Sequence, residues 1–438
     1  MRTLIRWLTP GMGIKRWLFL AVLGLLTVNG GVIALTYFFV RELRGRSTHG
    51  QLVTLGVVCV LMGMVVAAFA ARRLIREVVR VLHPAPPRLL DAFYRQRSKR
   101  GPKLVAIGGG TGLSTLLRGL KAYSDNITAI VAMADNGGSS GRLREELGVL
   151  PPGDIRHCLT ALAGEEELMT RLFDYRFRAG TTLLGHSFGN LFLTAMADIT
   201  GDLEQAIRAS SRVLAVRGQV LPATLVPLEL VATLEDGSVV RGESQITESQ
   251  GRIAAVRCEP EDPSALPEAI RAIQEADAII LGPGSLYTSI APNLLIPGLT
   301  EALLSSQAPR LYICNVMTQP GETDDYKVSD HVRALQQLAG PDIVQFVLVN
   351  EDLPQRLLEK YQDKGQFTVE YDAEGCAALG VRVLMAPLLD EGDMVRHDPE
   401  ALSKAIVDWL LRVRRESGAK ILPFPVEAEL SAKTKGWL

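Results

Sequence analysis

The chain has 438 residues, 47% of them apolar, and its 47 basic and 48 acidic side chains give a formal net charge of −1. This length allows one large hydrophobic core, or two smaller ones, together with appendages. The near-zero net charge excludes a general electrostatic attraction to nucleic acid. Five scattered cysteines, without a CxxC pair or a Cys/His cluster, exclude a disulfide framework and a zinc site.

Two apolar runs of membrane-spanning length come first, from Trp17 to Val40 and from Leu52 to Ala71, and neither contains a charged residue. A signal peptide is the alternative for the first run, but no clear small-x-small cleavage site follows it and a second run comes soon after. Basic residues flank the pair more densely than they occupy its loop, which places both ends in the cytoplasm. We predict that residues 1–80 form a two-helix transmembrane hairpin of a multi-pass protein in the inner, cytoplasmic membrane.

A basic, proline-containing connector is predicted for residues 81–102. Between positions 72 and 100 there are nine Lys or Arg residues but only two acidic ones, Glu77 and Asp91. This composition suits a segment held near anionic lipid head groups, or equally a helix end with a solvated basic face. The soluble domain is predicted over residues 103–425, in the cytoplasm, and residues 426–438 form a C-terminal tail.

The soluble part alternates short apolar runs with helical patterns, which is typical of a parallel sheet covered on both faces. The predicted strands lie at residues 104–107, 127–134, 278–285, 310–317 and 343–350. We therefore predict a Rossmann-like, doubly wound, mostly parallel α/β fold. Two insertions interrupt it: residues 152–212 have a helical pattern, and residues 213–257 have an antiparallel pattern with a hairpin turn at Asp236-Gly237.

A glycine-rich loop, Gly108-Gly109-Gly110-Thr111-Gly112, joins the first predicted strand to a helix. Backbone amides at such a junction favour a bound phosphate. The loop matches neither the dinucleotide fingerprint, whose third glycine would fall at Leu113, nor the P-loop, which requires a following Lys-Ser/Thr. A tight turn without a ligand is the alternative.

The second predicted strand leads into Asp135-Asn136-Gly137-Gly138-Ser139-Ser140-Gly141-Arg142. An acidic residue at this place holds ribose hydroxyls in dinucleotide folds. The guanidinium of Arg142 could hold a diphosphate while Ser139 and Ser140 donate hydroxyl groups. A flexible surface loop would have a similar composition.

Asp154 follows Pro152-Gly153 at the start of a predicted helix, where it is either an N-cap or a second carboxylate of the site. In the second case Asp135 and Asp154 would share a Mg²⁺ ion with phosphates of a substrate, because magnesium keeps few protein ligands. This is the one metal site that the sequence indicates, and no other cofactor is predicted.

Three further loops belong to the same edge of the predicted sheet. Gly185-His186-Ser187-Phe188-Gly189-Asn190 precedes a helix, and His186 is either an acid or base or a hydrogen-bonding residue of the turn. Gly282-Pro283-Gly284-Ser285, like the first glycine loop, is a glycine turn between a strand and a helix, where a phosphate would bind. The segment 315–324 contributes polar residues. Ligands of open α/β sheets bind at the carboxyl ends of the strands, so these loops should converge on one site for a ligand with more than one polar or anionic end.

Taken in order, GGGTGLS, ADNGGSSGRLR, PPGDIRHCL, GHSFGNL, GPGSLYTSI-x-PNLL and NVMTQPGETD resemble the gluconeogenesis factor family, the bacterial branch of the 2-phospho-L-lactate transferase-like superfamily. The resemblance covers roughly residues 103–415, and the membrane hairpin is extra to it. It implies a Rossmann-like core that binds UDP-sugars such as UDP-N-acetylglucosamine and influences cell shape and envelope synthesis during gluconeogenic growth. The residues implied as nucleotide and sugar contacts are Gly109, Gly110, Thr111, Gly112, Asp135, Asn136, Gly137, Ser139, Ser140, Arg142, Asp154, His186, Ser187, Asn190, Gly284 and Ser285.

The transferase branch of the superfamily uses magnesium to move a phospholactyl group from a guanosine diphosphate carrier, and its second strand typically ends in two adjacent aspartates. Here Asp135 is followed by Asn136, which puts transferase activity in doubt. Two hypotheses remain: a membrane-tethered nucleotide-sugar sensor, expected as a homo-oligomer with an envelope-synthesis regulatory partner, and a magnesium-dependent transferase. An NAD-dependent oxidoreductase is disfavoured by the absent third glycine.

Overall fold

The computed structural model describes residues 14–43, 51–82, 101–164, 166–179, 183–249 and 251–418. The chain divides into two compact units, Met1–Tyr94 and Arg95–Leu438. Most of the predicted connector, residues 83–100, lies outside the described residues, and so does the predicted tail at 426–438.

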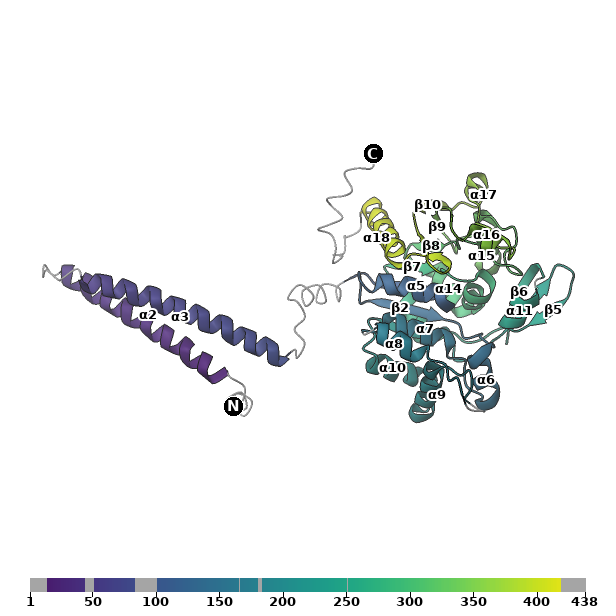
Figure 1. Cartoon of the computed structure of the whole chain (residues 1–438). Helices are drawn as coiled ribbons and strands as arrows, with labels where there is room; N and C mark the ends of the chain where they lie inside the picture. Colours follow the sequence, from purple (N-terminus) through teal and green to yellow (C-terminus); the bar gives the residue numbers. More distant parts are fainter. Residues whose placement is uncertain are drawn as a thin grey trace. The chain divides into compact units, whose positions relative to one another are not determined.

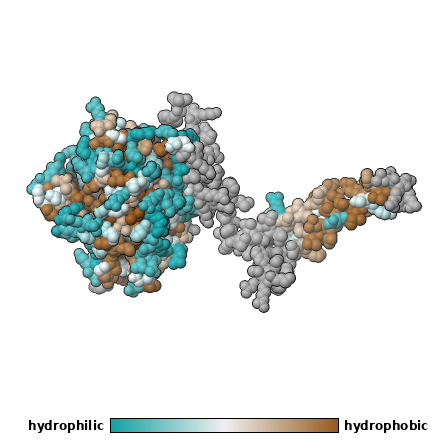
Figure 2. Space-filling model, turned by 180° about the vertical axis from the view of Figure 1, so that it is seen from behind, coloured by the Kyte–Doolittle hydropathy of each residue, from teal (hydrophilic) through white to brown (hydrophobic). Residues whose placement is uncertain are grey.

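The N-terminal unit contains two long helices, α2 (Ile14–Leu43) and α3 (Gln51–Leu82) (Figure 1). Each includes a stretch that is long and apolar enough to cross a membrane, Phe19–Val40 in α2 and Val53–Arg73 in α3. Only 11% and 17% of the residues in these stretches are buried, and Figure 2 shows the apolar side chains on their outer surface in brown. Length and composition thus make both helices candidate membrane spans, close to the predicted bounds.

Two pairs of glycines bring α2 and α3 into backbone contact. A Cβ atom added to Gly24 would lie 2.9 Å from the carbonyl oxygen of Gly63, and one added to Gly31 would lie 2.8 Å from that of Gly56. The two glycines of each helix are about two turns apart, so they fall on one face. Small residues that allow such close approach are typical of helix pairs in membranes.

The second unit is built on a seven-stranded sheet in the order β10-β9-β8-β7-β1-β2-β3, in which every neighbouring pair is parallel. The strands are β1 (Leu104–Gly108), β2 (Ile127–Val131), β3 (Gln219–Pro222), β7 (Ala278–Leu281), β8 (Arg310–Ile313), β9 (Phe346–Asn350) and β10 (Arg382–Ala386). The predicted doubly wound α/β fold is therefore confirmed.

Both faces of the sheet are buried, because alternate residues of a strand point to opposite sides. Val105 and Ile107 of β1 pack in one core and Leu104 and Ala106 in the other. The first core is closed by α12 (Pro267–Gln274), α13 (Ala291–Leu294), α14 (Pro297–Ser305) and α15 (Val328–Ala339). The second is closed by α5 (Gly110–Leu120), α7 (Gly153–Leu162), α10 (Leu203–Val213) and α18 (Pro399–Glu416).

The two insertions differ in how well the pattern predicted them. The stretch 152–212 is mainly helical, as expected, with α8 (Glu166–Phe173) and α9 (Phe188–Thr200) between α7 and α10. The stretch 213–257 is only partly antiparallel: β5 (Val239–Arg241), β4 (Glu229–Leu234) and β6 (Ile253–Glu259) form a small antiparallel sheet with the predicted turn at Asp236-Gly237.

That second expectation is wrong in two places. β3 joins the main sheet in parallel with β2, because its buried QVLP segment extends the core instead of pairing with β4. Residues 243–249 form helix α11 (Glu243–Ser249), not a strand. The remaining elements are α6 (Gly138–Leu147), the π-helix η1 (Leu286–Ile290), α16 (Leu358–Gln362), α17 (Ala373–Ala378), β11 (Leu389–Glu391) and β12 (Val395–His397).

The order of the strands reverses between β1 and β7. From β1 the sheet grows through β2 to β3, and from β7 it grows in the opposite direction to β10. The crevice above the carboxyl ends of such a pair is the place where doubly wound sheets bind their ligands.

Candidate functional site

A cavity of about 580 Å³ opens at the carboxyl ends of β1, β7 and β8, at the reversal point of the sheet. Of the predicted site residues, Gly109, Gly110, Thr111, Gly112, Gly284 and Ser285 line it. Residues that follow β8, from Asn315 to Gln319, complete one side, and residues 394–397 reach over from the small β11–β12 hairpin. The structure therefore brings the two predicted glycine loops together in one cavity.

The first glycine turn is an abrupt change from strand to helix. Gly109 is extended and caps α5, which begins at Gly110 with a positive φ of 64°. A helix N-terminus leaves backbone N–H groups without intrahelical acceptors and carries a partial positive charge, so it favours an anion at the entrance of the cavity.

The second glycine turn touches the first through the backbone. A Cβ atom on Gly112 would lie 2.5 Å from the carbonyl oxygen of Pro283 and 3.1 Å from Cα of Gly284. Gly282 has a φ of 82° and donates its N–H to the carbonyl of Ile107 at 2.8 Å. Only glycine at position 112 allows the two turns to lie this close.

Ser285 is held by the polar segment that follows β8. Its Oγ accepts a hydrogen bond from Nε2 of Gln319 at 2.7 Å, and Oε1 of Gln319 accepts one from Nδ2 of Asn315 at 3.2 Å. The polar residues predicted at 315–324 thus support the second turn from the neighbouring strand.

Asp154 lies against the first turn. It occupies the first turn of α7, whose N-cap is Pro152, so the N-cap interpretation of Asp154 is wrong. A Cβ atom on Gly109 would overlap the carboxylate of Asp154. The carboxylate therefore lies directly beside the glycine turn, as expected if Asp154 is a second carboxylate of the site.

Asp135 is a partly buried neighbour of Asp154. Its Oδ1 accepts the N–H of Gly137 at 2.8 Å. Burial is the main cause that raises the pKa of Asp135, and the negative charge of Asp154 raises it further, against the hydrogen bonds from Gly137 and Ser140. Asp135 and Asp154 thus form a pair of carboxylates beside the first glycine turn. Such a pair could bind Mg²⁺ together with phosphate oxygens and water. No group of three or more metal-binding side chains occurs among the described residues.

The remaining predicted residues form a hydrogen-bond network behind the cavity. Nδ2 of Asn190 donates to Oγ of Ser140 at 3.1 Å, and Oγ of Ser187 caps α9 by accepting the N–H of Asn190 at 3.2 Å. Because Ser140 in turn bonds Asp135, this network runs from the start of α9 to the carboxylate at the site.

His186 and Ser139 form the second branch of the network. Oγ of Ser139 lies 3.1 Å from Nδ1 of His186 and accepts the N–H of Ser187 at 3.3 Å. Burial, and then the charge of Arg142, lowers the pKa of His186, so the hydrogen-bonding interpretation of this residue fits the structure.

Arg142 contacts the loop before α9. Its Nη1 donates to the carbonyl oxygen of Leu184 at 2.9 Å, so the guanidinium fastens the loop before α9. In this conformation Arg142 does not line the cavity, and the interpretation that it holds a diphosphate has no support from its contacts.

Replacement of Asn190 by alanine tests the network. The change leaves the Ser140 hydroxyl with one partner fewer, and we expect the free energy of unfolding to fall by about 1–2 kcal/mol. Urea unfolding measures it, with Thr194→Val on the same helix as the control, since Thr194 bonds only the carbonyl of Asn190. Equal stability of Asn190→Ala and the wild type would show that the network is not a structural support.

Glu243 is the most prominent lining residue that the sequence did not predict. It starts α11, and Asn136 fixes that start by accepting the N–H of Ser244 at 3.1 Å and donating to Gln245 at 2.8 Å. Burial, followed by the charges of Asp154 and Asp135, raises the pKa of Glu243 to about 9. No pattern in the sequence indicates that Glu243 lines the site, because it lies in an insertion for which the pattern predicts antiparallel strands.

The raised pKa of Glu243 has a predictable effect on stability. Between pH 4.5, the value for the unfolded chain, and about 9, the folded chain binds a proton that the unfolded chain has released. Stability is therefore lost as the pH rises through this window. We expect Glu243→Gln, which cannot ionise, to be more stable at pH 7 by about 3 kcal/mol and to match the wild type below pH 4. Urea unfolding at both pH values would contradict this if the two proteins were equally stable at pH 7.

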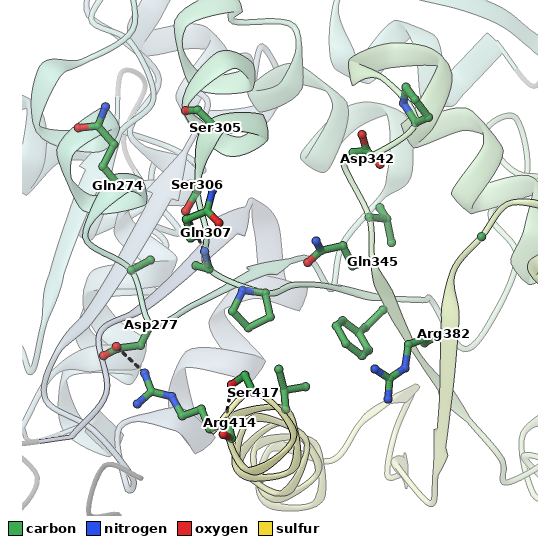
Figure 3. A pocket seen from close by; sticks show the side chains of 18 of the residues that line it. Gln274, Asp277, Ser305, Ser306, Gln307, Asp342, Gln345, Arg382, Arg414 and Ser417 are labelled. Carbon is green, nitrogen blue, oxygen red and sulfur yellow. Dashed lines mark hydrogen bonds and ion pairs between the residues drawn. The ribbon is translucent and has the colours of Figure 1, made fainter. Parts of the chain in front are cut away.

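A larger cavity of about 1120 Å³ lies near the opposite ends of the strands, beside α18 (Figure 3). Its two arginines are ion-paired: Arg414 pairs with Asp277 at 2.5 Å, and Arg382 pairs with Glu416 at 3.2 Å. Neither of the two predicted glycine turns lines it, and none of the other predicted site residues does. The smaller cavity at the reversal point is therefore the candidate site.

The fold and this cavity define a doubly wound α/β protein whose candidate site combines two glycine turns with partly buried carboxyl groups. The family model described as 2-phospho-L-lactate transferase CofD matches residues 104–389. The chain belongs to this family, in its gluconeogenesis factor branch.

Individual relatives agree with that assignment. The gluconeogenesis factor of Bacillus subtilis is 50% identical over 311 residues, which cover 98% of that protein and 70% of this chain. A relative from Nostoc sp. is 52% identical over 420 residues, 92% of both chains. A crystal structure of a UPF0052 family member from Bacillus halodurans superimposes with a TM-score of 0.68 at 46% identity, and covers 70% of this chain and 99% of its own.

Proposed function

We propose that this protein is a gluconeogenesis factor that binds a nucleotide-sugar of the UDP-N-acetylglucosamine type in the 580 Å³ cavity. The observation that carries the proposal is the backbone contact between the turns at Gly112 and Pro283. Two glycine turns at the N-termini of helical segments suit a diphosphate, and the polar remainder of the cavity suits a sugar. Occupancy would regulate envelope synthesis and cell shape during growth on gluconeogenic carbon sources, through a protein partner.

Calorimetric titration tests the ligand. The full chain in detergent is titrated with UDP-N-acetylglucosamine, GDP and NAD, each with and without Mg²⁺. Metal-independent binding of the UDP-sugar, with the ligand recovered intact, is the expected result. Magnesium-dependent binding of GDP alone, or binding of NAD alone, would overturn the sensor proposal.

A second candidate is a magnesium-dependent transferase that acts on a nucleotide diphosphate-linked substrate. It is favoured by the family membership and by the adjacent, partly buried carboxylates of Asp135 and Asp154. These residues would hold the ion, which would neutralise developing charge on the transferred phosphoryl group. Conversion of a nucleotide-linked substrate by the purified protein, lost in Asp154→Asn, would establish it.

Membrane tethering belongs to the same proposal. The glycine contacts between α2 and α3 and the apolar outer surface support a hairpin surrounded by lipid, and homologous chains such as that of B. subtilis match only 70% of this protein. The hairpin would keep the α/β domain at the inner face of the membrane.

Charges on the lipid-facing surface should release the protein. Leu26 and Val65 are 63% and 68% exposed on the hairpin, and arginine near the centre of a span costs roughly 2.5–3.5 kcal/mol for insertion. We expect the double variant Leu26→Arg/Val65→Arg to leave the carbonate-resistant membrane fraction in which the wild type remains. The control is Leu147→Arg, a residue of α6 that is 59% exposed, and retention of the double variant in the membrane would refute the lipid-facing assignment.

A further inference from the structure

We propose that Glu243 determines ligand specificity by hydrogen-bonding the hydroxyl-bearing sugar end of the nucleotide-sugar, while the glycine turns hold the diphosphate. This inference rests on the proposed function of the cavity and adds to it the orientation of the ligand and the residue that distinguishes a nucleotide-sugar from a free nucleotide.

Glu243 is held in place from both ends of its helix. Asn136 anchors the start of α11 through Ser244 and Gln245. Farther along the helix, Thr247 donates to Oε1 of Glu322 at 3.4 Å. α11 is thus fastened to two loops of the main domain, and Glu243 at its start lines the cavity.

The anchor at Glu322 is itself rigid. This side chain is 3% exposed, and its Oε1 also accepts the hydroxyl of Thr288 at 3.1 Å, from the π-helix that follows the second glycine turn. α11, which begins at Glu243, is therefore bonded through Glu322 to the segment that follows the second glycine turn. This bond fixes the separation between the start of α11, which would contact the sugar, and the turn, which would contact the diphosphate.

The cavity is surrounded by both acidic and basic groups. The charge of Asp154 raises the pKa of Asp135, and the charges of Asp154 and Asp135 contribute to the raised pKa of Glu243, so Glu243 lies close to two other carboxyl groups. The N-terminus of α5, beside which Asp154 lies at Gly109, also opens on the cavity, and the cavity lining includes the basic side chains of Arg118 and Arg396. The free N–H groups at the glycine turns attract an anion and a carboxyl group does not, so a ligand with one anionic and one neutral end places its diphosphate at the glycine turns and its neutral end at Glu243.

The chemistry of Glu243 suits a sugar. Because burial raises its pKa well above neutrality, the carboxyl group carries a proton at pH 7 and presents a donor and an acceptor together. Hydroxyl and acetamido groups offer the complementary pair. A free nucleotide ends before this contact and gains nothing from it.

The test compares UDP with UDP-N-acetylglucosamine by calorimetry on the full chain in detergent. The variants are Glu243→Ala, Glu243→Gln and, as a matched control, Glu248→Ala, which removes an exposed carboxylate from the same helix. We expect Glu243→Ala to weaken UDP-N-acetylglucosamine about ten- to a hundredfold and to leave UDP within about twofold. Glu243→Gln, which keeps a donor and an acceptor, should retain most of the sugar-dependent affinity, and Glu248→Ala should behave as the wild type.

Each other outcome decides against the inference. Equal loss of both ligands in Glu243→Ala, or no loss of either, overturns the assignment of Glu243 while the proposed function stands. If the wild type binds neither ligand, the proposed function fails and this inference fails with it. If Glu243→Ala does not fold, Glu243→Asp, whose carboxyl group is one methylene shorter, must show the same selective loss of the sugar nucleotide.

Discussion

Replacement of Gly112 by alanine should abolish nucleotide-sugar binding and destabilise the α/β domain. The added Cβ atom would lie 2.5 Å from the oxygen and 2.8 Å from the carbonyl carbon of Pro283, and both are backbone atoms that cannot rotate away. The two glycine turns must separate, so the diphosphate loses one of them. Overpacking of this kind costs roughly 1–3 kcal/mol of stability.

Thermal unfolding and calorimetry of the full chain measure the two effects of Gly112→Ala. Gly164→Ala is the control, because its Cβ atom would meet the nearest atoms at an ordinary 3.5 Å. Undiminished UDP-N-acetylglucosamine binding by Gly112→Ala would mean that the contact between the turns is only a feature of the fold.

The variant Asp135→Asn should lose affinity and gain stability. Asparagine can still accept the N–H of Gly137, but it removes the charge beside Asp154. We expect binding of the nucleotide-sugar to weaken about a hundredfold, as for a lost hydrogen bond to a charged group. The raised pKa of Asp135 means that its charge opposes folding above the unfolded-state value of 3.8, so the variant should be more stable at pH 7.

The opposite signs of these two effects distinguish a ligand contact from a structural residue. Calorimetry and urea unfolding at pH 4 and pH 7 measure them on one preparation, and the stability difference should shrink at the lower pH. A variant that binds normally would remove Asp135 from the site, and one that is less stable at pH 7 would show that its charge supports the fold.

The sequence predicted the central sheet and the edge on which the candidate site lies. Continuous apolar strands such as β1 and glycine-rich loops at their ends are local signals, and they were sufficient to place Gly109–Gly112 beside Gly284 and Ser285. β3 was not predicted as part of the main sheet because its four residues follow a long helical insertion and resemble the antiparallel strands after it. Their partner β2 lies far away in the sequence.

The roles within the site were harder to predict than its location. Arginine is a residue that commonly binds phosphate, yet the guanidinium group of Arg142 donates a hydrogen bond to the carbonyl oxygen of Leu184. No local sequence pattern indicates that Glu243 belongs to the site. Its position depends on contacts of its helix with Asn136, which is more than a hundred residues away in the sequence. Residue type and local spacing do not determine which side chains face a cavity when packing between distant segments decides it.

The junction of the two glycine turns also determines when the protein becomes able to bind. Nδ2 of Asn293 donates to the carbonyl of Gly108 at 3.4 Å across 185 residues of sequence, so the two halves of the cavity meet only after the chain between them has folded. Contacts this distant in sequence form late and slowly. A nascent chain that ends before β7 lacks the second glycine turn and therefore half of the cavity. Only the completed domain can bind the ligand, so only the completed domain is stabilised by the binding free energy. Nucleotide-sugar would thus protect the finished protein from unfolding and proteolysis without assisting its early folding steps.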